Sequence, residues 1–165
     1  MKTTDTIRDL IGRVEHSLSQ LRDLSPQELN THPGGHPNSP AWLLWHVGRE
    51  LDMQLARISG GEEVWARHRD RFNLGDIGDT LGYGHTPEEA RSVLLDDHTL
   101  LRAYIREALS AVAAHAARVT DWDEVVDTYD GEPVTRQVRV TSLLLDALEH
   151  LAQVHYIAGM PSVVP

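Results

Sequence analysis

Four long segments of this chain repeat apolar residues at intervals of three and four, and this repeat restricts the chain to a largely helical fold. Each segment carries one apolar face, which is stable only when it is buried against other helices. Helices are predicted at about residues 4–23, 40–59 and 87–118, and a last helix is predicted to begin at Thr141 or Ser142 and to end by Gly159. A short extra helix is expected within residues 62–71.

Helix-start signals support two of these boundaries. Ser39-Pro40 and Thr86-Pro87 each place a capping hydroxyl before a proline at the first helical position. Residues 72–85 are rich in glycine and are expected to form a loop. Between residues 121 and 139, β-branched residues flank the turn dipeptide Asp130-Gly131, which predicts a short extended crossing or hairpin.

Four long helices, with a long connection between the second and the third, predict an all-α fold of the four-helix-bundle class. The bundle should have a long crossover and a short extended segment before the last helix. We expect one domain over residues 1–165, because this length can bury a hydrophobic core without disulfides.

Composition excludes several classes of function. The chain has no cysteine, which excludes disulfides, zinc–thiolate sites and a cysteine nucleophile. Its formal net charge is −10, and it shows no basic stripe, so we expect no nucleic-acid partner. It has no signal peptide and no apolar run long enough to span a membrane, so we expect a cytoplasmic protein with no membrane partner.

Three residues are candidates for a metal site. Asp146 and His150 are four apart in the last predicted helix, so their side chains lie about 40° apart on one face. His46, near the middle of the second helix, is the best third ligand. Two imidazoles and one carboxylate form an open site that leaves positions for water or substrate, and Zn²⁺, Ni²⁺, Fe²⁺ and Mn²⁺ all accept such ligands.

Neighbouring residues fit less well as ligands. His155 is about 140° round the helix from His150, and Glu149 is about 100° away, so both should point elsewhere. Glu50, one turn after His46, is a candidate to orient the imidazole or to act as a catalytic proton carrier. His32, His36 and His85, in predicted loops, are further candidates to line the mouth of a site.

The spacing also has an ordinary structural explanation. Asp146 and His150 could be a hydrogen-bonded pair one turn apart, and a single histidine in a bundle helix is more often a surface or core residue than a ligand. Trp42 and Trp45 are expected to pack in the core rather than to form a substrate cage.

Three stretches resemble the DinB-like superfamily, which includes DinB- and YfiT-like metalloenzymes. Residues 39–52 (SPAWLLWHVGRELD) resemble its second helix, where a histidine follows an aromatic and aliphatic run. Residues 146–161 (DALEHLAQVHYIAGMP) resemble its final helix, and residues 71–89 resemble the connection between the second and third helices. The resemblance covers most of the chain in the expected order.

Two departures bear on what the resemblance implies. Asp146 and Ala152 stand where the usual pattern has histidine and glycine. An acidic residue at the first position is similar to the mycothiol-dependent maleylpyruvate isomerase branch, in which a carboxylate and two histidines hold the metal. By this resemblance, His46, Asp146 and His150 hold a divalent metal, and the protein forms a homodimer.

The leading hypothesis is therefore a metal-dependent S-transferase or isomerase that uses a low-molecular-weight thiol of the mycothiol or bacillithiol type on a small-molecule substrate. The metal would lower the thiol pKa, and a cysteine-free enzyme needs such a borrowed thiol. The alternatives are a metal-dependent hydrolase, a non-catalytic metal-binding or stress-response protein of this superfamily, and a carrier or sensor of small hydrophobic molecules.

Overall fold

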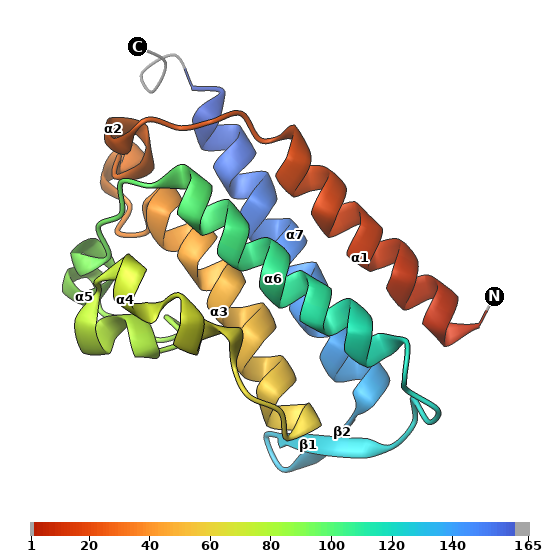
Figure 1. The fold of residues 1–165 in the computed structure, drawn as a ribbon. Helices are drawn as coiled ribbons and strands as arrows, with labels where there is room; N and C mark the ends of the chain where they lie inside the picture. Colours follow the sequence, from red (N-terminus) through yellow and green to blue (C-terminus); the bar gives the residue numbers. More distant parts are fainter. Residues whose placement is uncertain (1, 161–165) are drawn as a thin grey trace.

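Four long helices form the bundle in the computed structural model, which describes residues 2–160 (Figure 1). They are α1 (Thr3–Gln20), α3 (Pro40–Ser59), α6 (His98–Ala116) and α7 (Arg136–Ala158). Helices α1 and α3 each pack against both α6 and α7. Helices α3 and α6 run in one direction, and α1 and α7 run in the opposite one (Figure 1). The predicted all-α bundle is confirmed.

Short elements connect the first three long helices. Between α1 and α3 lie α2 (Pro26–Leu29) and η1 (Pro33–Gly35). The long crossover from α3 to α6 contains η2 (Val64–Arg67), α4 (Arg69–Phe72), η3 (Gly75–Asp79) and α5 (Pro87–Ser92), which lie beside α3 (Figure 1). The short helix expected within residues 62–71 is therefore two short helical pieces. Helix α2 was not predicted, although Ser25 caps it and Glu28 completes a capping box.

The single long helix predicted at residues 87–118 is wrong, because the chain leaves the helical path between α5 and α6. The side chain of Asp97 accepts a hydrogen bond from the Leu100 N–H and so caps a new helix. The side chain of Asn30 pairs with both the N–H and the carbonyl of Leu95. These side chains supply hydrogen bonds that a continuous helix would have made within its own backbone.

The predicted hairpin is confirmed. Strands β1 (Val125–Tyr129) and β2 (Glu132–Thr135) pair antiparallel, and Asp130 and Gly131 take positive φ angles of 50° and 81° at the turn. Helix α7 follows the second strand directly, because the Thr135 hydroxyl accepts a hydrogen bond from the Val138 N–H. The predicted start at Thr141 or Ser142 is therefore too late.

The first half of α3 is buried on every side. Residues 40–49 all have low exposure, because α6 and α7 cover the inner face and the long crossover covers the outer one. A helix that is buried all round would usually be apolar. Here the buried set includes His46 and Arg49, and Asp52 is buried one turn later. These polar side chains need partners inside the protein. Within residues 2–160, no helix has the length and apolarity needed to cross a membrane.

Gly48 lets α3 approach α6 closely, so replacing it with alanine should destabilise the protein. A Cβ at position 48 would overlap the ring of Tyr104, whereas a Cβ at Gly12 of α1 would meet no atom within 4 Å. We expect Gly48→Ala to lower the free energy of unfolding by about 1–3 kcal/mol. Gly12→Ala should raise it by about 0.5–1 kcal/mol, because alanine is the better helix former. Urea unfolding measures both, and equal stabilisation by the two variants would contradict the close contact.

Candidate metal centre

Helices α3 and α7 bring His46, Asp146 and His150 together. Each offers one ligand atom, and the three atoms all lie within 4.8 Å of one another. His46 Nε2 is 3.7 Å from Asp146 Oδ2, and His150 Nε2 is 3.5 Å from Asp146 Oδ1. The Asp146 carboxylate thus lies between two imidazoles. One comes from α3 and the other from α7, about a hundred positions later in the sequence.

Each imidazole is oriented through its other nitrogen. His46 Nδ1 lies 2.6 Å from the backbone carbonyl oxygen of Leu81, and His150 Nδ1 lies 2.8 Å from Gln153 Oε1. Both partners are acceptors, so each Nδ1 carries the proton and donates it. When the ring is neutral, its Nε2 atom then has a lone pair that faces Asp146, which is the tautomer that a metal ligand needs.

The donor set fits a divalent metal ion. Asp146 Oδ2 is buried and has no hydrogen-bond partner among residues 2–160, which is costly for a carboxylate oxygen unless a cation binds there. Metal–nitrogen and metal–oxygen bonds of about 2.1 Å separate neighbouring tetrahedral ligands by roughly 3.4 Å. The observed separations of 3.5 and 3.7 Å are close to this value.

The two histidines differ electrostatically. Burial lowers the pKa of His46, and only part of that effect is offset by Leu81 and Asp146, so this ring is neutral at neutral pH. Burial alone would also lower the pKa of His150, but its hydrogen bonds to Asp146 and Gln153 outweigh burial and raise it. A metal at Asp146 would therefore compete with a proton at His150 more than at His46.

An aromatic wall holds the His46 ring. The indole of Trp42 stacks on His46 at a centroid distance of 4.8 Å and an interplanar angle of 19°. Trp42 Nε1 donates to His85 Nδ1 at 3.1 Å, and His85 Nε2 lies 2.9 Å from Thr80 Oγ1. His85 therefore supports the Trp42 ring instead of facing the metal. Trp42 combines the core packing that was expected with contact to a ligand.

A cleft of about 500 Å³ opens beside His46 and Asp146. Its walls come from α3, α7, the loop after η3 and the β hairpin, which contributes Thr128, Tyr129 and Val134. The hairpin is anchored by Asp127, which pairs with Arg57 and Arg139 at 2.7 and 2.6 Å. The candidate site is thus open to small molecules from the hairpin side.

Glu50 lines this cleft, one turn after His46. Burial, and to a smaller extent the nearby charge of Asp146, raises the pKa of Glu50 to about 7 against the opposing effects of Gln54 and Arg139. A carboxyl group with a pKa near 7 can both accept and donate a proton at neutral pH. The role of Glu50 as a proton carrier stays a prediction.

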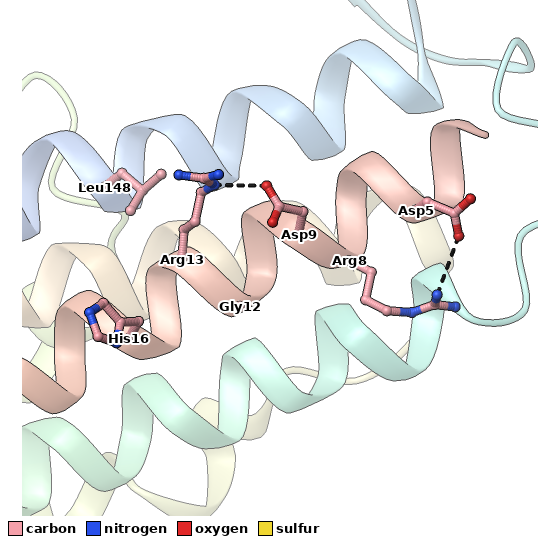
Figure 2. A pocket seen from close by; sticks show the side chains of 7 residues that line it. All are labelled: Asp5, Arg8, Asp9, Gly12, Arg13, His16 and Leu148. Carbon is pink, nitrogen blue, oxygen red and sulfur yellow. Dashed lines mark hydrogen bonds and ion pairs between the residues drawn. The ribbon is translucent and has the colours of Figure 1, made fainter. Parts of the chain in front are cut away.

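Residues that the helical geometry excluded do lie elsewhere. His155 Nε2 is 2.9 Å from the carbonyl oxygen of Ser17 on α1, so this histidine links α7 to α1. A hollow of about 830 Å³ is lined by residues of α1 and by Leu148 of α7, and it contains none of the three candidate ligands (Figure 2). Its charged side chains pair along the helix, Arg8 with Asp5 at 3.3 Å and Arg13 with Asp9 at 2.7 Å.

The sequence analysis missed the groups that orient the ligands. Gln153 lies three residues after His150 and could have been found from helical spacing. The Leu81 carbonyl could not have been found, because any residue in a loop offers a backbone carbonyl and the sequence does not mark which one is used.

Comparison with known proteins identifies the family of this chain. The sequence profile of the DinB superfamily matches residues 11–156. The chain belongs to the DinB superfamily. A conserved protein of Enterococcus faecalis, known from a crystal structure, is similar at 30% identity and a TM-score of 0.76, over 94% of this chain and 92% of that one. No curated protein matches at a significant level. The DinB superfamily is metal-binding, in agreement with the His–Asp–His group found here.

Gly82 lies against this centre, which yields a prediction with a matched control. Its φ is +92°, and a Cβ there would lie 2.9 to 3.1 Å from atoms of Trp45, Trp42 and His46. We expect Gly82→Ala to cost about 1–3 kcal/mol of stability and to weaken metal binding roughly 10- to 100-fold. Gly84 has a φ of +80° but open space around it, so Gly84→Ala should share the backbone strain and keep the metal affinity. Calorimetric titration with Zn²⁺ compares the two, and equal affinities would contradict the prediction.

Proposed function

We propose that this protein is a metal-dependent enzyme in which His46, Asp146 and His150 hold a divalent Zn, Ni, Fe or Mn ion. The observation that carries the proposal is the buried, unpartnered Oδ2 of Asp146, which faces His46 Nε2, while Oδ1 of the same carboxylate faces His150 Nε2. A hydrogen-bonded Asp–His pair alone would explain the bond to His150 but not the second oxygen, which faces His46 from another helix.

The preferred activity is transfer or isomerisation that uses a low-molecular-weight thiol of the mycothiol or bacillithiol type. A divalent ion bound by these ligands acts as a Lewis acid and lowers the pKa of a thiol, whose thiolate form is the nucleophile. The chain has no cysteine of its own, so the sulfur has to come from a cosubstrate. The 500 Å³ cleft beside the ligands is of a size suited to a small-molecule substrate.

The chain's own residues supply the remaining functions. The Leu81 carbonyl and Gln153 hold the two imidazoles in the binding tautomer, and the Trp42 indole shields one face of His46 from water. Glu50 accepts the proton that the thiol loses, and returns a proton when a product requires one. The homodimer expected from the resemblance stays a prediction, and light scattering tests it.

The proposal is tested first by the metal content of the protein purified without a histidine tag. We expect His150→Ala to lose bound metal, because one of the three ligands is gone, and to keep its helical circular dichroism, because His150 is not part of the apolar core. His155→Ala is the matched control on the same helix and should retain metal, because His155 contacts Ser17 instead. Elemental mass spectrometry measures both.

Two results would contradict the ligand assignment. Stoichiometric metal in His150→Ala would show that this imidazole is not a ligand. Loss of metal in His155→Ala would show that the ion binds on another face of α7. A wild-type protein that takes up none of the four metals when they are supplied would remove the proposed function.

Metal-assisted hydrolysis is the second candidate, in which water replaces the thiol as the nucleophile. The raised pKa of Glu50 favours it equally, because a carboxylate with a pKa of about 7 is a suitable general base for water. Assays of the metal-loaded protein with an electrophilic ester, with and without added thiol, separate the two. Activity that requires thiol supports transfer, and activity that persists without it supports hydrolysis. Metal binding with no turnover of either kind would indicate a non-catalytic binding protein or a carrier.

Replacement of Glu50 gives a further prediction that needs no substrate. The pKa of Glu50 is about 7 in the folded protein and about 4.5 in the unfolded chain. Its contribution to stability is therefore complete below about pH 4.5 and is lost as the pH rises through about 7. In metal-free protein, we expect Glu50→Gln to remove this loss, on the order of 1–3 kcal/mol between pH 4.5 and 8. Urea unfolding across this range measures it, and parallel curves for the two proteins would contradict it.

A further inference from the structure

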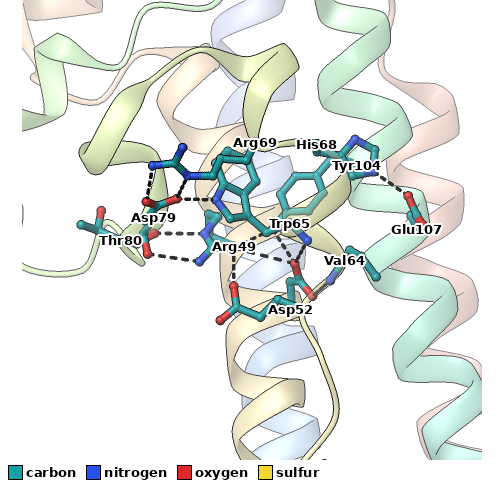
Figure 3. Close-up of polar contacts among 11 residues, drawn as sticks. Arg49, Asp52, Val64, Trp65, His68, Arg69, Asp79, Thr80, Tyr104 and Glu107 are labelled. Atoms are coloured by element: carbon teal, nitrogen blue, oxygen red, sulfur yellow. Dashed lines mark hydrogen bonds and ion pairs between the residues drawn. The ribbon is translucent and has the colours of Figure 1, made fainter.

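Arg49 is a buried charge at the centre of a polar network that does not touch the metal site directly (Figure 3). Its guanidinium donates from Nε to the carbonyl oxygen of Thr80 at 3.1 Å and from Nη2 to that of Asp79 at 3.3 Å. On its other side, Nη1 donates to the Tyr104 hydroxyl at 3.2 Å and pairs with Glu63 at 2.8 Å. Arg49 therefore joins α3 to the backbone at the end of η3.

The next carbonyl along that backbone is the one that orients His46. Thr80 is followed directly by Leu81, whose oxygen lies 2.6 Å from His46 Nδ1. Helix α3 carries both His46 and Arg49. It therefore bonds three consecutive carbonyls of this backbone, at residues 79–81. The Thr80 hydroxyl also accepts from His85, and His85 in turn holds the indole that stacks on His46.

We propose that Arg49 is a positioning residue for the metal centre: it fixes the backbone at residues 79–81 so that the Leu81 carbonyl holds His46 as the Nδ1–H tautomer and leaves Nε2 for the metal. This inference depends on the proposed metal site for its binding readout, but its effect on the His46 tautomer does not.

The planar guanidinium is what this position requires. Its fork reaches the Asp79 and Thr80 carbonyls from two different nitrogens while a third nitrogen holds Tyr104 and Glu63. It also lies 4.8 Å above the Trp65 ring, which fixes its plane. A lysine would keep the positive charge near Asp52 and Glu63, but its single ammonium cannot hold both sets of partners at once.

The first test is Arg49→Lys, compared with Tyr104→Phe as a matched control. The Tyr104 hydroxyl accepts from Arg49 and donates to Asp52 at 2.9 Å, so its removal damages the same network on the side away from residues 79–81. We expect both variants to be less stable. Only Arg49→Lys should weaken Zn²⁺ binding, by roughly 10- to 100-fold, the range typical of lost support for a ligand histidine.

The second readout is the tautomer of His46 in metal-free protein, measured from its ¹⁵N imidazole shifts by NMR. The wild type and Tyr104→Phe should show the Nδ1–H form, and Arg49→Lys should show a mixture of the two neutral forms. Unchanged shifts in Arg49→Lys would overturn the proposal, even if the variant is unstable. A merely structural role for Arg49 would lower stability without moving this equilibrium.

Asp79→Ala keeps the proposal testable if Arg49→Lys does not fold. The Asp79 side chain is partly exposed and accepts from Trp65 Nε1 at 2.8 Å and from Arg69 Nε at 2.7 Å, so it holds the same turn from the solvent side. We expect this variant to shift the His46 tautomer in the same direction and to weaken Zn²⁺ binding by a smaller factor. If the wild type binds no Zn²⁺ but the variants still show these tautomer shifts, the proposed function is removed and the role of Arg49 stands. The absence of any tautomer shift in Asp79→Ala and Arg49→Lys would overturn that role alone.

Discussion

The hydrogen bond between His46 and the Leu81 carbonyl is the contact on which the rest of the site depends. It decides which nitrogen of a buried imidazole is protonated, and so it decides whether a lone pair faces Asp146. The long crossover supplies the acceptor, and α3 holds that crossover at two points. The Asp52 carboxylate accepts hydrogen bonds from the Val64 and Trp65 N–H groups where η2 begins. Arg49 donates to the Asp79 and Thr80 carbonyls where η3 ends.

Sequence periodicity was sufficient for the bundle and for much of the site, because both obey the geometry of single helices. Asp146 and His150 share a face through their spacing alone, and His155 is excluded by the same rule. The break before α6 could not be predicted in this way, because its cause is Asn30, some sixty residues earlier in the chain. The role of the Leu81 backbone was equally out of reach, since it depends on where a loop packs and not on which residue type is there.

The carboxylate at position 146 would set the charge of the proposed metal centre. A divalent ion held by two neutral imidazoles and one carboxylate carries a net charge of +1, whereas three imidazoles would leave it at +2. Such an ion would be bound more strongly by its protein ligands and would polarise an approaching group less strongly. A proton acceptor with a pKa close to 7, such as Glu50 in the same cleft, would compensate for weaker activation.

The β hairpin covers one side of the cleft yet contributes no ligand to the metal group. Its residues line the cleft, and Asp127 joins the hairpin to α3 and α7 through Arg57 and Arg139. Changes in the strands and turn can therefore alter which molecules enter without disturbing the helices that hold the ion. Such a separation would allow selectivity to change within a short segment while the residues of the metal group stay the same.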